Sequence, residues 1–326
     1  MKSDEKRAFQ QLNRGYQSVF QYGRMSVGLV APIENYMMKP VPSMKHHLER
    51  IQLAEELGFS AVWLRDVPFN VPSFGDAGQV FDPFVYLGYL AAQTENIALG
   101  VASIVLPLRH PAHVAKSAAS VDALSGGRLI LGVASGDRPE EYPAMNLSYE
   151  DRGYRFRESF EYIRHMQKSS PAFSNLYGQF KHDMDLLPKP TASKLPILVT
   201  GGSQQDKNWI AKNSDGWMVY PHQVETQQHI ISDWNKRLKD VGNNPQPVMQ
   251  PLYFDWIEQG DDKPKPLHLG FRSGISYLKD YLKALESIGV NHVALNLRFN
   301  QQNLVATLEK LAEEILADFP QQKIAA

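Results

Sequence analysis

The chain has 326 residues, of which 43% are hydrophobic and 21% charged, and its formal net charge is -1. This composition is typical of a globular protein with a large core, and the absence of a basic run argues against nucleic-acid binding. No apolar stretch is long enough to cross a bilayer, and the polar N-terminus does not have the pattern of a secretory signal. The sequence contains no cysteine. Disulfides and zinc–thiolate sites are therefore excluded, and a reducing cytoplasm is the expected compartment.

Eight apolar segments have the length and composition of buried strands. They are residues 26–31, 61–65, 97–105, 128–134, 195–200, 216–220, 248–257 and 291–297. Each is followed by a segment with helical spacing or helix-capping residues: 42–57, 82–94, 110–124, 152–167, 204–213, 225–241, 274–288 and 301–319. Such alternation favours parallel strands joined by right-handed crossovers. It predicts an α/β protein with a closed (β/α)8 barrel; the alternative, an open doubly wound sheet, lacks a GxGxxG motif after any strand.

Two segments stand apart from the repeating units. Residues 1–24 are expected to form a short helix or arm outside the main fold, which leaves 25–326 as a single barrel domain. Residues 169–193 are irregular and too long for a plain connection between a helix and a strand. We therefore expect them to form an insertion that covers the C-terminal mouth of the barrel, together with loop 67–81.

The C-terminal ends of barrel strands are where ligands bind and chemistry takes place. Here they collect polar residues: Glu34, Asp66, Ser103, Leu106 to His110, Ser135 to Arg138, Thr200 to Gln204, Tyr220 to His222 and Arg298. The turn Thr200-Gly201-Gly202-Ser203-Gln204 joins a strand to a helix N-terminus, where free N–H groups and the helix dipole favour a phosphate. An ordinary turn with Ser203 as the helix N-cap is the alternative.

The other groups at the strand ends allow two interpretations each. The small residues Ala102 and Ser103 would let a flat ligand approach the backbone, or they reflect tapering of the core. Asp66 beside Arg65, and Asp137 beside Arg138, would orient a substrate or form ion pairs with neighbours. His110 and His113 have no HxH, HExxH or carboxylate partner, so no metal site is expected.

Four stretches of sequence resemble the bacterial luciferase-like flavin-dependent monooxygenases. They are AEELGFSAVWLRD (54–66), IALGVASIVLPLRHPAHVAKSAASVDALSGGRLILGVASG (97–136), LPILVTGGS with SDGW (195–203 and 214–217) and YLKALESIGVNHVAL (281–295). The pattern LPLRHP, helix, DxLSGGRLxLGVxSG is highly specific to that family. The chain is also similar to a subgroup of uncharacterised luciferase-type oxidoreductases that share WLRDVPF, FGDAGQ and GDRPEEY.

The resemblance implies a barrel oxidoreductase with FMN, or in one branch a deazaflavin, across the C-terminal mouth. By position, Ala102 and Ser103 correspond to a cis non-proline peptide against the flavin ring. Ser135, Gly136 and Asp137 correspond to flavin contacts after the fourth strand, and Gly202, Ser203 and Gln204, following Thr200 and Gly201, to the phosphate-binding turn. The implied reaction is a two-component monooxygenation of a small organic substrate, with a separate flavin reductase and a homodimeric oxygenase.

The chain departs from the family pattern at two positions. Val67 stands where luciferase has its catalytic histidine, so luciferase chemistry on aldehydes is not supported. Ser135 stands where an arginine holds the FMN phosphate, and Arg138, Arg109 and Arg272 are the candidates to replace it. The polar groups we expect near the reacting carbon are Asp66, His110 and His222. Deazaflavin-dependent hydride transfer and a flavin-binding protein without turnover remain the alternatives.

Overall fold

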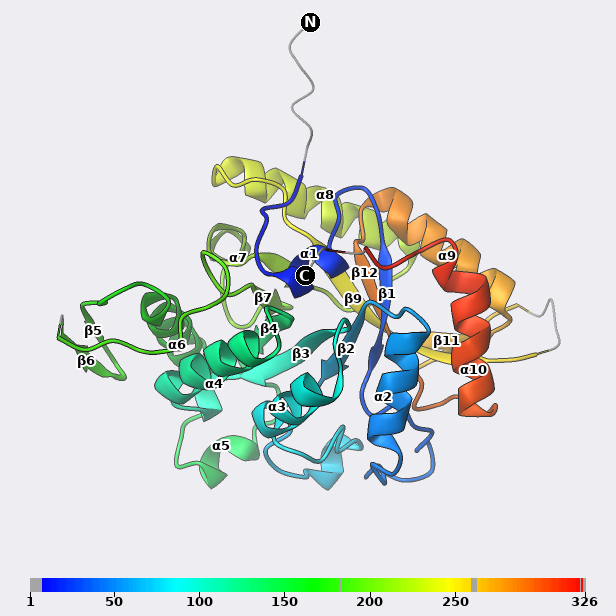
Figure 1. Cartoon of the computed structure of the whole chain (residues 1–326), viewed down its shortest axis with the longest axis horizontal. Helices are drawn as coiled ribbons and strands as arrows, with labels where there is room; N and C mark the ends of the chain where they lie inside the picture. The colour runs from blue at the N-terminus through cyan, green and yellow to red at the C-terminus, as the bar shows by residue number, and fades with distance from the viewer. Residues whose placement is uncertain (1–7, 182, 259–262, 323, 325–326) are drawn as a thin grey trace, which may run out of the picture.

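The computed structural model describes residues 8–181, 183–258, 263–322 and 324. Its centre is a sheet of 10 strands, in which β10 and β11 extend from β9 and the others close into a parallel barrel (Figure 1). The barrel strands are β1 (Ser26–Val30), β2 (Ala61–Leu64), β3 (Ala98–Val105), β4 (Leu129–Ala134), β7 (Ile197–Thr200), β8 (Gly216–Met218), β9 (Val248–Trp256) and β12 (His292–Asn296). Pairing of β12 with β1 closes the ring. The predicted (β/α)8 barrel is confirmed.

Helices cover the outside of this barrel. They are α2 (His47–Glu56), α3 (Pro83–Gln93), α4 (Pro111–Leu124), α6 (Arg152–Met166), α7 (Lys207–Asn213), α8 (Val224–Asp240), α9 (Ile275–Ile288) and α10 (Leu304–Leu311), which continues as the π-helical turn η3 (Ala312–Leu316). Three of them begin later than predicted, because local capping decides the first turn. Asp206 caps α7 and Asn303 caps α10 through their side chains. Before α2, the Glu34 carboxylate accepts from the N–H groups of Ser43 and Met44 and holds that segment as a loop.

Several short elements connect the main ones. They are the helix α5 (Glu141–Ala144), the 3-10 turns η1 (Pro72–Phe74) and η2 (Leu106–Leu108), and two hairpins, β5 (Phe173–Asn175) with β6 (Gly178–Phe180) and β10 (Lys265–Leu267) with β11 (Gly270–Ser273). None of them was predicted. Strands of three or four residues carry too little alternation to be recognised.

The barrel interior is filled by side chains rather than open. Small residues such as Ala61 and Ala98 lie beside larger ones such as Trp63 and Met218. The Trp63 ring lies directly over Gly100, where a Cβ would come within 2.2 Å of Trp63 Cε3. Gly100 therefore makes room for the indole, which fills this level of the barrel interior.

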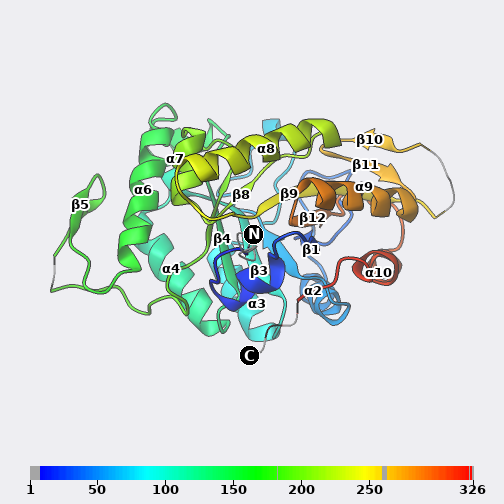
Figure 2. The same cartoon turned by 90° about the horizontal axis from the view of Figure 1, so that it is seen from above.

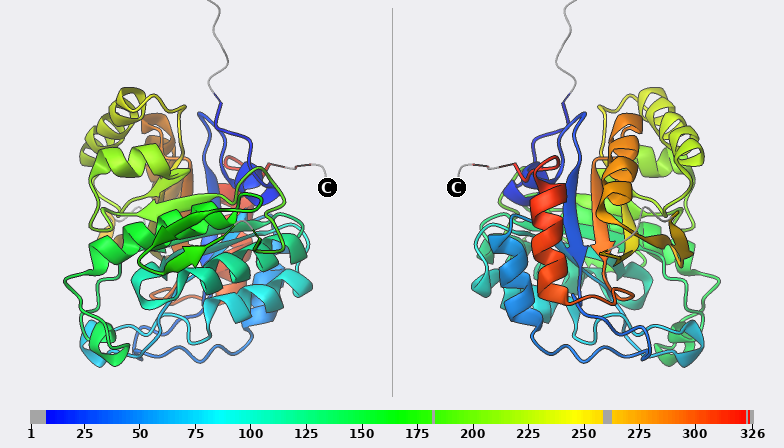
Figure 3. Two further views of the ribbon diagram at one scale, coloured as in Figure 1. Left: turned by 90° about the vertical axis from the view of Figure 1, so that its left-hand side faces the viewer. Right: turned by 90° about the vertical axis from the view of Figure 1, so that its right-hand side faces the viewer.

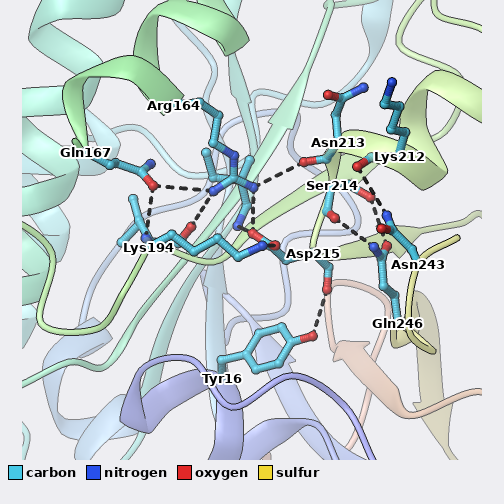
Figure 4. Close-up of polar contacts among 12 residues, drawn as sticks. Tyr16, Arg164, Gln167, Lys194, Lys212, Asn213, Ser214, Asp215, Asn243 and Gln246 are labelled. Atoms are coloured by element: carbon cyan, nitrogen blue, oxygen red, sulfur yellow. Dashed lines mark hydrogen bonds and ion pairs between the residues drawn. The ribbon is translucent and has the colours of Figure 1, made fainter. Parts of the chain in front are cut away.

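The N-terminal end of the barrel is closed by α1 (Arg14–Val19). Tyr16 and Val19 belong to the same buried cluster as the interior side chains. The Tyr16 hydroxyl donates to the backbone oxygen of Asp215 over 2.7 Å. Figure 4 shows this contact beside the Asp215 carboxylate, which pairs with Arg164 at 2.6 Å and Lys194 at 2.5 Å. The expectation that residues 1–24 lie outside the main fold is therefore wrong for α1, and Asp215 of the SDGW motif is a structural anchor.

The 169–193 segment lies on the flank of the barrel. Its β5–β6 hairpin is outside α6 in both Figure 1 and Figure 2. Phe173 stacks on His165 of α6 with ring centroids 4.7 Å apart. The Thr191 hydroxyl then donates to Asp122 of α4 over 2.8 Å. The prediction that this insertion covers the mouth is not supported, because its aromatic side chains bind it to the outer helices.

Loop 65–82 is the segment that lies at the mouth. Together with α5 it forms the end of the molecule opposite α1 (Figure 3). Asp76 of this loop contacts Arg65 after β2, Arg298 after β12 and Arg138 after β4. The loop therefore spans the strand ends on which a ligand would sit.

Candidate functional site

The register of the strands decides which side chains enter the mouth. Side chains two residues apart along a strand point to the same side. Ala61 and Trp63 belong to the interior cluster, so Arg65 continues that side at the mouth. Leu198 belongs to it as well, which places Thr200 inside. Arginine and threonine side chains thus replace the apolar interior where each strand ends.

The Ala102–Ser103 peptide is cis, at the position that the family resemblance indicated. The Ser103 and Thr200 hydroxyls are hydrogen-bonded to each other. The Thr200 hydroxyl also lies 3.2 Å from the sulfur of Met218. These contacts join the ends of β3, β7 and β8 and leave a half-buried strip of small side chains and backbone along one wall of the mouth.

The end of β4 forms a tight turn against Tyr142. The Tyr142 hydroxyl donates to the backbone oxygen of Ser135, and burial raises the pKa of that hydroxyl, so it stays a donor. Gly136 has φ +78°, and a Cβ there would lie 2.7 Å from Val105 Cγ1 and 2.9 Å from the Tyr142 hydroxyl. Only glycine fits this position, and the turn brings backbone to the mouth. Asp137 points outward and is exposed.

The turn 200–206 does not have the Ser203 cap of the alternative interpretation. Asp206, rather than Ser203, is the N-cap of α7, and its carboxylate accepts from the N–H groups of Asn208 and Trp209. The Ser203 hydroxyl instead donates to the backbone oxygen of Thr200 over 2.7 Å. A negative side chain thus already occupies the N-terminus of α7. An anion is not expected at the helix end itself.

The N–H groups inside this turn, unlike those at the N-terminus of α7, are not occupied by a side chain of the described residues. Gly201, Ser203 and Gln204 have positive φ values, a conformation that makes backbone N–H groups converge. Within the described part of the chain, the N–H groups of Gly202, Ser203 and Gln204 have no protein acceptor. A Cβ on Gly202 would meet nothing within 4 Å. The turn therefore offers free donors on an open surface.

The N-terminus of α6 lies against the same turn. A Cβ on Gly153 would come within 2.8 Å of the Gln204 Cβ, and Gln205 donates to the Gly153 backbone oxygen over 2.7 Å. Asp151, the N-cap of α6, makes no side-chain cap. Among the described contacts, the N–H groups of Gly153 and Tyr154 donate to no protein acceptor. Two segments with free N–H groups thus lie against each other.

Arg152 is the first residue of α6 and precedes Gly153. Its guanidinium lies over the Tyr149 ring, 3.7 Å from the centroid, and Nη1 donates to the Tyr149 backbone oxygen over 2.8 Å. Tyr149 in turn packs edge-on against Tyr142, which holds Ser135. The Nε of Arg152 is buried without a hydrogen-bond partner among the described residues. Arg152 was not among the predicted residues, because it lies 17 positions beyond Ser135 and only the fold brings it back.

The three arginines proposed to replace the family arginine have other partners. Arg109 binds Asp66 and Asp82 at 2.7 and 2.9 Å. Arg272 lies 3.3 Å from Asp255 on the edge formed by β11. Arg138 lies over the Phe74 ring at 4.2 Å and donates to the Asp76 backbone oxygen. None of them contacts the turn 200–204 in the described structure.

The three predicted catalytic residues do not come together. Both carboxylate oxygens of Asp66 are used by Arg109, at 2.7 and 2.9 Å, and one also accepts from Val105 N–H. Asp66 thus has a structural partner, which does not support a catalytic role. His110 is the N-cap of α4, where Nδ1 accepts from Ala112 N–H, and its ring packs on Tyr177 of the flanking hairpin. His222 is exposed in the β8–α8 loop.

A buried ionic cluster at the mouth escaped prediction. Asp76 Oδ2 lies 2.7 Å from Arg65 Nη1 and 3.0 Å from Arg298 Nη1. Burial acts to raise the pKa of Asp76, but Arg65, the Gly78 N–H and Arg298 outweigh it and hold that pKa below its usual value. The signal in the sequence was the alternation Ala61, Trp63, Arg65, which puts a charge on the interior side of β2.

Two kinds of structure are absent from the described residues. No group of three or more His, Cys, Asp or Glu side chains is arranged to hold a metal ion. Within the same part of the chain, no helix combines the length and the apolar composition needed to span a membrane.

Comparison with known proteins gives both uncharacterised and characterised relatives. An uncharacterised protein of Mycobacterium tuberculosis (strain H37Rv) is 28% identical over 290 residues, which cover 81% of this chain and 92% of the relative. The oxygenase component of a flavin-dependent trigonelline monooxygenase from Acinetobacter baylyi is 30% identical over 220 residues, 66% of this chain and 59% of that protein.

Solved structures share the fold at low sequence identity. The monooxygenase RslO1 from Streptomyces bottropensis has a TM-score of 0.74 at 19% identity, with 90% of this chain and 99% of that chain covered. An F420-dependent secondary alcohol dehydrogenase with an F420-acetone adduct gives 0.73 at 16%, covering 90% and 99%. The oxygenating constituent of 3,6-diketocamphane monooxygenase from Pseudomonas putida, in complex with FMN, gives 0.71 at 14%, covering 92% and 100%.

The family model described as "Luciferase-like monooxygenase" matches residues 25–254, a span that includes β1 through most of β9 and both turns of the candidate site. This match extends over more than half of the chain. The barrel, the cis peptide and the turns after β4 and β7 therefore belong to a member of the luciferase-like monooxygenase family.

Proposed function

We propose that this protein is the oxygenase of a two-component flavin-dependent monooxygenase, which takes reduced FMN from a separate reductase and acts on a small organic substrate. The observation that carries the proposal is the contact between two segments with free backbone N–H groups, the turn 200–204 and the N-terminus of α6, which begins with Arg152. Such an arrangement suits a phosphate dianion. A relative described as an oxygenase component and a fold neighbour bound to FMN support the same interpretation.

The residues present fit the flavin along its length. The backbone N–H groups of Gly202, Ser203 and Gln204 would donate to the phosphate. Arg152 would take the role of the family arginine, whose position is occupied by Ser135 in this chain. The strip formed by Ala102, Ser103 and Thr200 would support the ring, because its small side chains leave backbone and hydroxyls accessible. Bound FMN would supply the redox chemistry and the activation of oxygen.

The chain's own contribution is binding, orientation and exclusion of water. Tyr142 fixes the Ser135 backbone oxygen and keeps the Gly136 turn against the mouth, so that Ser135, Gly136 and Asp137 would border the flavin. Loop 65–82 spans the strand ends and would limit access of water to the reacting groups. Of the three predicted catalytic residues, His222 is the one whose side chain is not engaged elsewhere, and a proton-transfer role is assigned to it.

Deazaflavin-dependent hydride transfer is the second candidate. The observation in its favour is the F420-dependent alcohol dehydrogenase among the solved structures with this fold. The phosphate of a deazaflavin cofactor would use the same N–H groups, so the geometry of the turn does not distinguish the two candidate functions. The distinction lies in which cofactor binds and whether oxygen is consumed.

We further propose a homodimer located in the cytoplasm. Val85 and Tyr89 on the outer face of α3 are 74% and 45% exposed, and the neighbouring Phe81 is 41% exposed. Exposed apolar side chains gathered on one face are typical of a protein–protein contact. The absence of cysteine from the sequence supports a reducing compartment.

The test is a fluorescence titration of the full chain with FMN and, separately, with F420. We expect native protein to bind FMN. Gly202→Asp should bind it at least about tenfold more weakly than Gly202→Asn, because a carboxylate repels the phosphate while the isosteric amide does not. Position 202 has open space around it, so both variants should fold.

Each other result has a definite meaning. Equal FMN affinities of the two Gly202 variants would place the phosphate elsewhere. Binding of F420 but not FMN would favour hydride transfer. Tight FMN binding without oxygen consumption, given a flavin reductase and a broad panel of substrates, would identify a flavin-binding protein without turnover.

A further inference from the structure

The ionic cluster at the mouth has more positive than negative charge. The guanidinium groups of Arg65 and Arg298 pair with the Asp76 carboxylate, and Arg138 donates to the Asp76 backbone oxygen and pairs with Glu141. Burial is the main cause that raises the pKa of Glu141, to about 7, so this carboxyl is only partly ionised near neutral pH. The cluster therefore has room for a further negative charge.

Several polar atoms of this cluster are buried without a hydrogen-bond partner among the described residues. They are Arg138 Nη1, Arg298 Nε, the Tyr36 hydroxyl and Glu141 Oε1, although Arg138 Nη1 and Glu141 Oε1 form an ion pair at 3.9 Å. The side chain of Arg138 is 6% exposed, and Tyr36 as a residue is 4% exposed. Leaving a buried donor unsatisfied costs about 1–3 kcal/mol, and more when it is charged. Unpartnered donors at the mouth of the barrel indicate that a ligand with hydrogen-bond acceptors binds there.

The two arginines that hold Asp76 come from the barrel itself. Arg65 follows β2 on its interior side, and Arg298 follows β12, whose Ala294 lies in the interior cluster. In the order of the closed sheet, β12 is four strands away from β4, so Arg298 stands across the mouth from Ser135 and Gly136. These arginines therefore face the flavin contacts proposed above rather than forming part of them.

Asp76, by contrast, comes from the loop that spans the mouth. Its Oδ2 accepts from Arg65 Nη1 and forms an ion pair with Arg298, and its Oδ1 accepts from the Gly78 N–H over 2.7 Å. Aromatic side chains lie beside it: Arg298 stacks over Tyr36 at 4.9 Å and over Phe299 at 5.4 Å. A carboxylate held by two guanidinium groups, one of which lies over aromatic rings, has the environment that an aromatic carboxylate ligand would have.

We propose that Arg65 and Arg298 bind the carboxylate of an organic acid substrate, and that Asp76 occupies its position until the substrate displaces it. Loop 65–82 then moves away from the barrel when the substrate enters. This assignment rests on the proposed function, since it takes the mouth as the place of reaction. It specifies the substrate class as a small, predominantly apolar or aromatic carboxylate.

The test uses benzoate as the probe and isothermal titration of the flavin-free full chain. Benzamide is the neutral control at constant ionic strength. Asp76→Asn removes the competing charge but keeps the side-chain shape, so we expect benzoate to bind about tenfold tighter or better than to the native chain, with benzamide unaffected. Glu140→Gln is the matched control. It removes a carboxylate from the same rim, where Ser73 is its contact, without touching either arginine.

A second variant covers the case in which Asp76→Asn does not fold. Arg298→Gln leaves the Arg65–Asp76 pair in place and should abolish benzoate binding to the native chain. Equal benzoate affinity of native chain, Asp76→Asn and Arg298→Gln would overturn the proposal, as would equal binding of benzoate and benzamide. FMN titration of the same samples reports on the proposed function separately, because the phosphate-binding turn lies outside this cluster.

Discussion

The indole Nε1–H of Trp63 donates to Nε2 of His292 over 2.8 Å at the centre of the barrel. Because an indole is only a donor, Nε2 carries no proton, and Nδ1–H must donate to the Ser26 hydroxyl, 2.8 Å away. That hydroxyl donates to the backbone oxygen of Val19 in α1 over 2.7 Å. A single chain of hydrogen bonds thus connects β2, β12, β1 and the helix that closes the barrel.

This arrangement predicts a specific loss of stability in mild acid. Burial lowers the pKa of His292 to about 3, whereas in the unfolded chain it is about 6.5. Below pH 6.5 the histidine is protonated in the unfolded state but stays neutral in the folded state. The contribution of His292 to the free energy of unfolding is therefore complete above pH 6.5. It falls by up to about 1.4 kcal/mol per pH unit as the pH drops toward 3. His292→Gln keeps an acceptor for Trp63 and should remove this slope.

Urea unfolding at several pH values between 6.5 and 4.5 measures the slope. His229→Gln is the control, since His229 is an exposed histidine of α8 and its replacement should leave the pH dependence as in the native chain. An unchanged slope in His292→Gln would show that other groups cause the acid sensitivity.

A glycine in the turn after β4 allows the energetic cost of backbone strain to be measured separately from that of a steric clash. Gly136 and Gly75 have nearly equal φ values, +78° and +79°, but a Cβ clashes only at Gly136. Gly75→Ala should cost about 1 kcal/mol of unfolding free energy from the left-handed backbone alone. Gly136→Ala should cost about 2 kcal/mol more and weaken FMN binding, because Tyr142 must move away from Ser135. Chemical unfolding of both variants gives the difference; similar costs would mean that the turn yields easily.

Replacement of Asp66 distinguishes a structural from a catalytic carboxylate. The Asp66 side chain is 1% exposed and Arg109 23% exposed, so Asp66→Asn should destabilise the protein by about 3 kcal/mol. The folded fraction should keep native FMN affinity. Asp233→Asn, which breaks a surface ion pair with Arg237, is the control and should cost less than about 1 kcal/mol. Native stability of Asp66→Asn combined with lost turnover would instead make Asp66 catalytic.

The prediction of the fold succeeded because its signals are local and repeated. Segments such as 97–105 and 128–134 are apolar over the whole length of a strand, and parallel strands buried on both faces require that pattern. Asp82 before Pro83 predicted the start of α3, and the structure confirms it as the N-cap. Caps are interactions between near neighbours, so the sequence shows both partners at once.

The prediction of the site was weaker for charged side chains, which either bind a ligand or form an ion pair with a residue distant in sequence. Asp66 and Arg109 are 43 positions apart, and nothing in either local sequence reveals that they meet. The same holds for Gly153 beside Gln204, and for Asp76 between Arg65 and Arg298. Whether a charged side chain is free for chemistry or satisfied by an ion pair depends on distances that only the closed barrel sets.

The sequence alone therefore determined the eight-unit barrel and the family, because periodicity, caps and glycines act within a few residues. The tertiary structure decided the closure of the barrel floor by α1, the flank position of residues 169–193 and the capping of α7 by Asp206. It also decided which charges meet at the mouth. Electrostatic and packing energies depend on separation in space, and contacts between distant segments exist only after the chain has folded.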